Sequence, residues 1–258
     1  MNKYTLITGA SSGLGEAFAR VFAKENSGLI LVARREDKLL ELKNSLINEN
    51  PNIDIIIKKC DLSKEDEVYK LYESVKEFDI LTWINNAGFG DYSLVSNQDL
   101  KKIISMIDLN IKALTILSTL YVRDYQNREG ACLINISSAG GYTIVPNAIT
   151  YCGTKFFVSS FTEGLANELK DKHLKVKVLA PAATKTEFGQ VASDNKNYDY
   201  DKSFSKYHTK EQMANFLLEL YKSDKVVGWV DRNTFEFYLK EPILNYAGKK
   251  LTKIISLS

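Results

Sequence analysis

The stretch LITGASSGLGEAFARVF, residues 6–22, decides the fold of this chain. It begins with a short apolar run, passes through Gly9, Gly13 and Gly15, and continues with apolar residues at helical spacing. Glycines let the backbone turn tightly and approach a ligand, and a helix N-terminus offers unpaired N–H groups to phosphate. We therefore expect a strand, a pyrophosphate-binding turn and a helix, while a glycine-rich turn without a ligand is the alternative. The turn residues predicted at this dinucleotide site are Gly9, Ser11, Ser12, Gly13, Leu14 and Gly15.

Beyond this turn, β-branched apolar runs alternate with helical patterns along most of the chain, which is typical of βαβ units and a parallel sheet. The predicted strands are 4–8, 29–33, 53–60, 81–85, 131–137, 176–180 and 226–230. The predicted helices are 15–25, 38–49, 66–77, 99–125 and 155–171. This order predicts an α/β fold, a doubly wound Rossmann-type parallel sheet of about seven strands with helices on both faces. We expect one domain over residues 1–258.

The composition excludes several classes of function. With 34 basic and 32 acidic residues the net charge is +2, which favours a small molecule over nucleic acid as the partner. The three cysteines form no CxxC, and the two histidines have no partners at metal-ligand spacing, so neither a disulfide framework nor a metal site is predicted. The N-terminus has no signal-peptide pattern and no uncharged apolar run reaches about 18 residues, so we expect a cytoplasmic protein without a membrane span.

One polar segment interrupts the alternation after Pro181. Residues 184–207 include SDNKNYDYDKS, which indicates a mobile loop rather than core. An insertion after a late strand lies at the ligand-bearing edge of an open α/β sheet. We interpret it as a substrate lid, and a solvated loop without function is the alternative.

The end of the second predicted strand indicates the cofactor. Sites for NAD carry an acidic residue there for the ribose 2′-hydroxyl, whereas arginine accommodates the 2′-phosphate of NADP. The chain has Arg34 and Arg35 at this point and its acids, Glu36 and Asp37, only afterwards. NADP(H) is therefore the predicted cofactor. An inward-turning Glu36 would favour NAD(H) instead.

Five tyrosines precede a lysine by four residues, so this spacing alone selects nothing. An (i, i+4) pair shares one helix face for many ordinary reasons. Only Tyr151, paired with Lys155, has a serine 13 residues upstream, Ser138, and that serine closes a predicted buried strand. The other four pairs are Tyr72/Lys76, Tyr198/Lys202, Tyr221/Lys225 and Tyr246/Lys250.

With TGASSGLG, NNAG at residues 85–88, and Ser138, Tyr151 and Lys155 in this order, nearly the whole chain resembles the short-chain dehydrogenase/reductase family, in its compact single-domain branch. The resemblance implies hydride transfer between nicotinamide and a carbonyl or secondary alcohol, with Tyr151 as general acid/base. It implies that Lys155 lowers the pKa of this tyrosine and binds the nicotinamide ribose, and that Ser138 holds the substrate oxygen. Asn110 matches the family's helical asparagine, which implies a water relay, and a polar surface residue in a regular helix is the alternative.

The resemblance also implies further cofactor contacts. One departure from the family pattern is Ala182, which replaces the glycine of a Pro-Gly turn after the sixth strand. The residues implied at the cofactor, besides the turn, the arginines, Tyr151 and Lys155, are Asp61, Leu62, Asn86, Ala87, Gly88, Pro181, Thr184 and Thr186.

Aromatic residues dominate the segments expected at the substrate, which favours a fairly apolar carbonyl or alcohol. The predicted substrate contacts, besides the lid, are Phe89, Tyr92, Tyr142, Val145 and Ala182. A catalytically silent NADP-binding sensor or scaffold is one alternative function. Another is a nucleotide-sugar-modifying relative, although such proteins carry GxxGxxG and a longer C-terminal domain.

Two expectations concern assembly. The resemblance implies a homodimer or homotetramer paired through the two long helices beside the site. The weakly amphipathic, basic stretch 238–258 is expected to pack on the core or a subunit, and contact with a membrane surface is the alternative.

Overall fold

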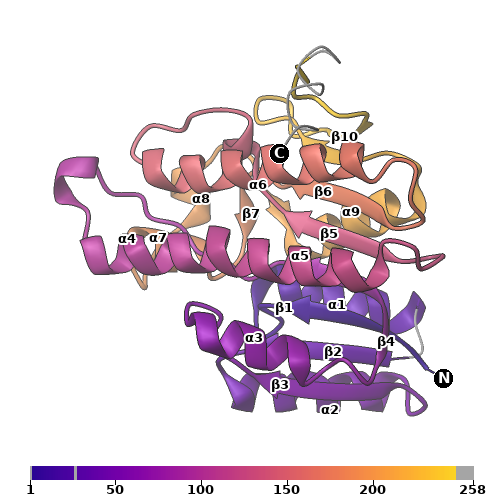
Figure 1. Cartoon of the computed structure of the whole chain (residues 1–258). Coiled ribbons are helices and arrows are strands. Elements are labelled where there is room, and N and C mark those ends of the chain that lie inside the picture. Colours follow the sequence, from indigo (N-terminus) through magenta and orange to yellow (C-terminus); the bar gives the residue numbers. More distant parts are fainter. Residues whose placement is uncertain (1, 26–27, 248–258) are drawn as a thin grey trace.

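An eight-stranded sheet forms the centre of the computed structural model, which describes residues 2–25 and 28–247 (Figure 1). The strand order is β10-β9-β6-β5-β4-β1-β2-β3, and every neighbouring pair is parallel except β9 with β10. This confirms the Rossmann-type α/β fold. The strands are β1 (Lys3–Thr8), β2 (Gly28–Ala33), β3 (Asp54–Lys59), β4 (Asp79–Asn85), β5 (Cys132–Ile136), β6 (Lys175–Ala180), β9 (Val227–Val230) and β10 (Phe237–Lys240).

The seven predicted strands are all present, and the sequence analysis missed β10. This strand has four residues, forms the antiparallel edge beside β9, and is only partly buried. A short strand that pairs on one side needs no long apolar run, so its sequence gives little signal.

Helices cover both faces of the sheet (Figure 1). Those that pack on one face are α1 (Gly13–Glu25), α2 (Glu36–Glu49) and α9 (Lys210–Lys222). Those on the other face are α3 (Glu65–Glu73), α5 (Leu114–Tyr125) and α6 (Ile149–Glu168), and α4 (Leu100–Ile107) packs against α6. The sequence analysis missed α9 and began α6 six residues late.

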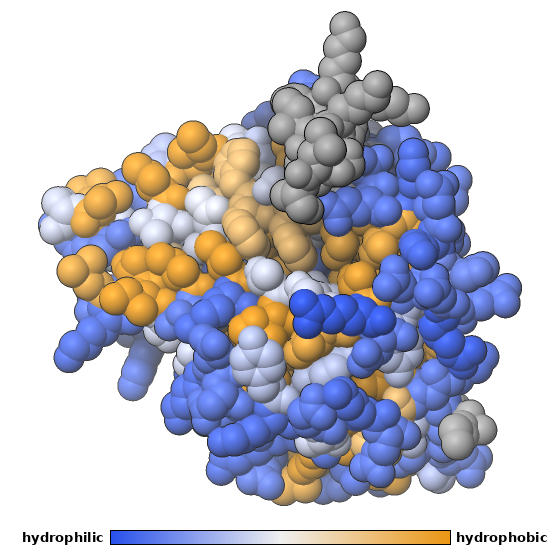
Figure 2. Space-filling view, viewed as in Figure 1, coloured by the Kyte–Doolittle hydropathy of each residue, from blue (hydrophilic) through white to orange (hydrophobic). Residues whose placement is uncertain are grey.

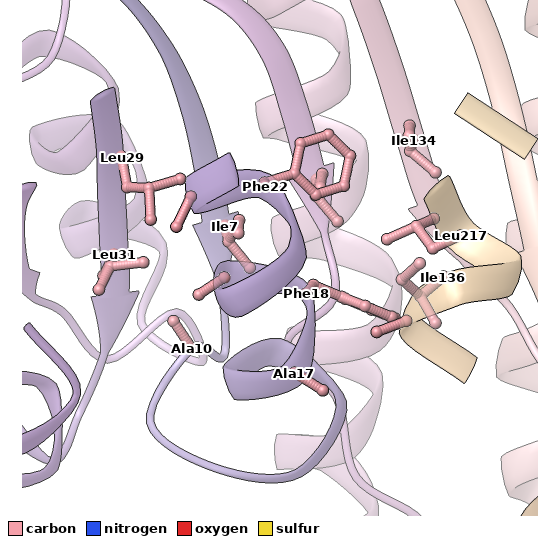
Figure 3. Close-up of a cluster of buried hydrophobic side chains, with 14 of the residues drawn as sticks. Ile7, Ala10, Ala17, Phe18, Phe22, Leu29, Leu31, Ile134, Ile136 and Leu217 are labelled. Atoms are coloured by element: carbon pink, nitrogen blue, oxygen red, sulfur yellow. The ribbon is translucent and has the colours of Figure 1, made fainter. Parts of the chain in front are cut away.

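Two phenylalanines of α1 form the centre of one core layer. Phe18 and Phe22 are fully buried, and they lie between the strands and α9, where Leu217 meets them (Figure 3). Each such burial stabilises the fold by roughly 1.5–3 kcal/mol. This packing fixes the helix that starts at the glycine turn.

A continuous helix, Leu100–Tyr125, runs along the other face and contains a π-helical segment, Asp108–Ala113, between α4 and α5. It is long and apolar enough to span a membrane by length and composition. In the structure, however, Leu117 and Tyr121 pack into the core beneath it, as in the core helix of a globular domain.

The segment 184–207 is more ordered than predicted. It holds β7 (Thr184–Lys185), which pairs with β8 (His208–Thr209), and the short helices α7 (Phe188–Ser193) and α8 (Tyr200–Ser203). The prediction of a loop was wrong because tyrosines in the polar run pack on one another. Their ring contacts include those of Tyr198 with Tyr200 and of Tyr200 with Tyr207.

The C-terminal segment packs on α6 as far as it is described. The buried Glu163 carboxylate accepts hydrogen bonds from the Tyr142 hydroxyl at 2.6 Å and the Leu244 N–H at 2.8 Å. Tyr246 donates to the Glu163 carbonyl. The rest of the stretch expected to pack on the core, residues 248–258, lies outside the described residues.

Candidate active site

A cleft of about 1170 Å³ lies at the carboxyl edge of the sheet and collects most of the predicted site residues. In open α/β sheets this edge, near the reversal of strand order between β1 and β4, is where ligands bind. Of the residues predicted to be catalytic or to bind the cofactor, only Gly15 and Asn110 do not line the cleft. Those that line it are Gly9, Ser11, Ser12, Gly13, Leu14, Arg34, Arg35, Asp61, Leu62, Asn86, Ala87, Gly88, Ser138, Tyr151, Lys155, Pro181, Thr184 and Thr186.

The glycine turn has a geometry that other residues would not adopt. Gly9 and Gly13 have φ angles of +70° and +57°, in the region that favours glycine. Gly15 serves close packing, since a Cβ there would lie 2.2 Å from the Gly9 carbonyl oxygen. The turn therefore brings the start of α1 against the end of β1 and leaves its N-terminus facing the cleft.

The end of β4 is fixed to the end of β1 by hydrogen bonds. The Thr8 hydroxyl accepts from the backbone N–H groups of Asn86 and Ala87 at 2.9 and 3.0 Å. The Asn86 side chain donates to the Thr8 carbonyl at 2.9 Å. These bonds set the floor of the cleft.

Arg35, at the end of the cleft where the adenosine is expected, already has two partners. Its Nη2 donates to the Ser12 hydroxyl at 2.6 Å and pairs with the Glu187 carboxylate at 2.9 Å. Arg34 is exposed and lines the cleft beside it. Glu36, the acid that could reverse the cofactor preference, pairs instead with Lys59 at 3.7 Å and does not line the cleft.

Ser138, Tyr151 and Lys155 converge at the other end of the cleft. Ser138 follows β5, and its Oγ accepts from the Gly140 N–H at 3.0 Å. Lys155 Nζ donates to the Ile136 carbonyl at 2.8 Å and lies 5.9 Å from the centroid of the Tyr151 ring. Both Tyr151 and Lys155 are buried.

Burial dominates the protonation of this pair. It raises the pKa of Tyr151 above its usual value, and a hydrogen bond with Ser138 only partly opposes this. Burial also lowers the pKa of Lys155 to about 8. Burial thus raises the pKa of Tyr151, opposite to the lowering expected from Lys155, whose Nζ lies 5.9 Å from the ring centroid.

The Tyr72/Lys76 pair shows why the four-residue spacing alone does not identify a catalytic tyrosine. Lys76 Nζ lies 5.7 Å from the Tyr72 ring centroid, close to the distance in the Tyr151/Lys155 pair. The Tyr72 hydroxyl, however, donates to Asp124 at 2.7 Å and faces α5, away from the cleft. Its place at the cleft, rather than contact within the pair, distinguishes Tyr151.

Asn110 is buried in the π-helical segment, so the interpretation as a surface residue of a regular helix was wrong. Its Nδ2 donates to the Phe89 carbonyl at 2.9 Å and to the Thr154 hydroxyl at 3.1 Å. Its Oδ1 accepts from the Phe89 N–H at 3.2 Å. Asn110 thus connects the turn after β4 to α6 at Thr154, the residue that directly precedes Lys155.

The expected substrate end is apolar. Phe188 of α7 packs on Tyr151 with ring centroids 5.4 Å apart, and Tyr92 packs on Phe188. Val145 belongs to the same cluster. Tyr142 was wrongly predicted to face the substrate, because its hydroxyl turns away to the buried Glu163. The predicted contacts that line the cleft are Phe89, Tyr92, Val145 and Ala182.

Ala182 fits the turn after β6 without strain. Among the described residues other than glycine, a positive φ occurs only at Asn147, Asp194 and Phe235. The replaced glycine is therefore not needed for the backbone conformation here.

The sequence analysis missed the residues that hold α7 over the cleft. Lys102 of α4 pairs with the buried Asp91 at 3.0 Å and with Asp194 at 2.6 Å, and it donates to the Val191 carbonyl at 3.2 Å. Glu187 holds the opposite end of α7 through Arg35. No local pattern marks these residues, since the partners are far apart in the chain.

Sequence relatives and solved structures similar to this chain point to the same family. The family model described as short chain dehydrogenase matches residues 3–197. An uncharacterized oxidoreductase of Staphylococcus saprophyticus is 32% identical over 199 residues, 75% of this chain and 78% of that protein. A 3-oxoacyl-[acyl-carrier-protein] reductase of Rickettsia prowazekii is 33% identical over 188 residues, 72% and 74% of the two chains. The solved short-chain dehydrogenase from Sphingobium yanoikuyae in complex with NADPH superposes with a TM-score of 0.80 at 28% identity, covering 88% and 87%.

Proposed function

The chain belongs to the short-chain dehydrogenase/reductase family of oxidoreductases, and we propose that it is an NADP(H)-dependent enzyme that interconverts a carbonyl compound and the corresponding secondary alcohol. The observation that carries the proposal is the convergence of Ser138, Tyr151 and Lys155 in the cleft that begins at the glycine turn. The nicotinamide cofactor supplies or accepts the hydride.

The residues of the cleft fit a dinucleotide. The N-terminus of α1 and the positive φ angles of Gly9 and Gly13 provide a backbone surface for a pyrophosphate. Asp61 and Leu62 line the cleft and would contact the adenosine, and Asn86, Ala87 and Gly88 would lie beneath the cofactor. Pro181, Thr184 and Thr186 also line the cleft and would contact the nicotinamide end.

Arg34 and Arg35 support the preference for NADP(H). Guanidinium groups bind phosphate through paired N–H donors, and Ser12 adds a hydroxyl within 2.6 Å of Arg35. Glu36 pairs with Lys59 outside the cleft, which weakens the case for NAD(H) as the alternative cofactor. The NADPH in the complex from Sphingobium yanoikuyae supports the same choice.

Tyr151 acts as the general acid in carbonyl reduction and as the base in the reverse reaction. Its raised pKa keeps the hydroxyl protonated at neutral pH, which is the form that reduction requires. Ser138 shares a hydrogen bond with it and holds the substrate oxygen. Lys155 supplies positive charge beside Ser138 and Tyr151 and binds the nicotinamide ribose.

Asn110 is proposed to support the proton relay from behind the site. Its amide donates to Phe89, in the turn after β4, and to Thr154, which directly precedes Lys155 on α6. It thereby positions the lysine even though it does not line the cleft.

The substrate is proposed to be fairly apolar. Phe89, Tyr92 and Phe188 surround the hydroxyl-bearing end of the cleft. The relative from Rickettsia prowazekii is named as a reductase of a 3-oxoacyl group, which supports carbonyl chemistry for the present chain.

A cytoplasmic homodimer or homotetramer is proposed as the working form, in line with the family. Hydrophobic side chains gather over α4 (Figure 2). Leu100, Ile104 and Ile107 of α4 are exposed, and Phe157 and Phe161 of α6 are partly exposed. These two helices form the proposed subunit contact.

The test is NADPH and NADH oxidation against a panel of ketones, aldehydes and quinones. Tyr151→Phe should lower kcat about 100-fold or more while cofactor binding persists, because it removes only the transferable proton. The control Tyr69→Phe changes an exposed tyrosine and should leave kcat unchanged. Full activity in Tyr151→Phe would refute the acid/base assignment, and cofactor binding without turnover on any substrate would favour the sensor or scaffold.

A further inference from the structure

Arg35, the proposed ligand of the NADP 2′-phosphate, already holds a carboxylate in this structure. Glu187 Oε2 lies 2.9 Å from Arg35 Nη2, and the same nitrogen donates to Ser12 Oγ at 2.6 Å. Glu187 directly precedes α7, 152 residues along the chain from Arg35. A residue of the segment over the substrate end thus reaches the adenosine end of the cleft.

We propose that Glu187 is a specificity-determining residue that competes with the 2′-phosphate of NADP(H) for Arg35, so that phosphate binding breaks the Arg35–Glu187 pair and frees the adjacent end of α7. This inference rests on the proposed NADP(H) preference. It adds an energetic penalty to NADP(H) binding, because the Arg35–Glu187 pair must break when the 2′-phosphate binds.

Charge explains the competition. A carboxylate and a phosphate are both anionic acceptors, and both require the same guanidinium donors. Burial raises the pKa of Glu187, but hydrogen bonds from Arg35 and Ser12 outweigh this and lower it overall, so Glu187 is charged at neutral pH. A phosphate that approaches Arg35 and Ser12 therefore meets a like charge unless Glu187 moves away.

The contacts of α7 explain why Glu187 can move. The far end of the helix is tied to α4 by Lys102, which pairs with Asp194 and with the buried Asp91. At the near end, Glu187 forms the ion pair with Arg35 through a side chain that is 53% exposed, and Gly189 N–H donates to the Tyr200 hydroxyl at 3.1 Å within the same segment. Because Phe188 follows Glu187 and packs on Tyr151, release of the near end uncovers the tyrosine. NAD(H) has no 2′-phosphate and leaves the pair intact.

The experiment compares two probes that differ only in the 2′-phosphate, adenosine 2′,5′-bisphosphate and 5′-AMP. Their Kd values are measured calorimetrically for the wild type and Glu187→Gln. An exposed ion pair is weak and a phosphate carries up to about two charges, so we expect about three- to tenfold tighter binding of the bisphosphate. Binding of 5′-AMP should change less than twofold. The gain should shrink in high salt, which screens exposed charges.

A matched control is Glu49→Gln. Glu49 pairs with Arg20 at 2.8 Å and is equally exposed, but lies away from the cleft. It should change neither Kd. An equal gain for both probes in Glu187→Gln, or no gain for the bisphosphate in a folded variant, would overturn the inference while leaving the proposed function intact. Wild-type protein that binds neither probe would overturn the proposed function itself.

Amide hydrogen exchange tests the release of α7 separately from affinity. In the wild type, the bisphosphate should speed exchange in Phe188–Ser193 relative to 5′-AMP. In Glu187→Gln, exchange in this helix should be fast with either probe. Greater protection of α7 by the bisphosphate would contradict the release.

Discussion

Lys155 shows at the residue scale what burial adds to a sequence motif. The spacing predicted a cation beside Tyr151, but it did not predict a lysine that is only 5% exposed with a single carbonyl partner. Burial lowers its pKa to about 8 from 10.5, which corresponds to roughly 3 kcal/mol of destabilisation while the group stays charged. The buried, charged Lys155 therefore lowers the stability of the fold.

Lys155→Met should accordingly stabilise the protein at pH 7 while abolishing activity. The charged lysine disfavours folding below pH 8, and this penalty fades between pH 8 and 10.5, where the folded protein releases the proton and the unfolded chain keeps it. We expect the free energy of unfolding to rise by about 1–3 kcal/mol at pH 7, since loss of the Ile136 hydrogen bond offsets part of the relieved penalty. This gain should decline toward pH 10. Urea unfolding at several pH values measures it.

Lys76→Met is the matched control. Lys76 has the same spacing from a tyrosine but is exposed, and a hydrogen bond to Glu73 raises its pKa. It should show no stabilisation at pH 7. A Lys155→Met protein that is less stable than wild type at every pH would show that burial does not penalise this charge.

At the scale of elements, the glycine turn determines how closely α1 packs against β1. A Cβ at Gly15 would lie 2.2 Å from a backbone oxygen, whereas a Cβ at Gly164 in α6 meets no atom within 4 Å of this chain. Two glycines in helices therefore have opposite roles. The first permits contact between α1 and β1, and the second only lowers helix propensity.

Gly15→Ala should lower the free energy of unfolding by several kcal/mol or prevent folding, because backbone must shift to admit the methyl group. Gly164→Ala should raise it by about 0.5–1 kcal/mol. Thermal unfolding of both variants provides the measurement. A Gly15→Ala protein as stable as wild type, with cofactor binding retained, would mean that the turn relaxes easily.

At the scale of the whole molecule, the exposed apolar side of α4 is the proposed site of subunit contact. Leu100, Ile104 and Ile107 are exposed and recur at helical spacing along one side of α4. An apolar patch on a protein of this kind indicates contact with another surface. We place the proposed subunit contact here.

Ile104→Glu should shift the protein toward a monomer, because a buried, unpaired carboxylate would disfavour the contact. Ile104 is 59% exposed in the single chain, so folding itself should be unaffected. Leu40→Glu, at 45% exposure on α2, is the control and should leave the assembly unchanged. Sedimentation velocity distinguishes the forms, and an unchanged distribution for Ile104→Glu would exclude α4 from the interface.

By itself the sequence determined the alternating strands and helices, the glycine turn and the choice of Tyr151 among five candidates. These features depend on local periodicity and on short fixed spacings, which a single chain displays directly. Only the tertiary structure decided that Tyr142 turns to Glu163, that Asn110 lies buried in a π-helical segment, that tyrosines order residues 184–207, and that Glu187 reaches Arg35. Each depends on partners distant in the chain, and the burial that sets the pKa values of Tyr151 and Lys155 exists only once those partners have packed.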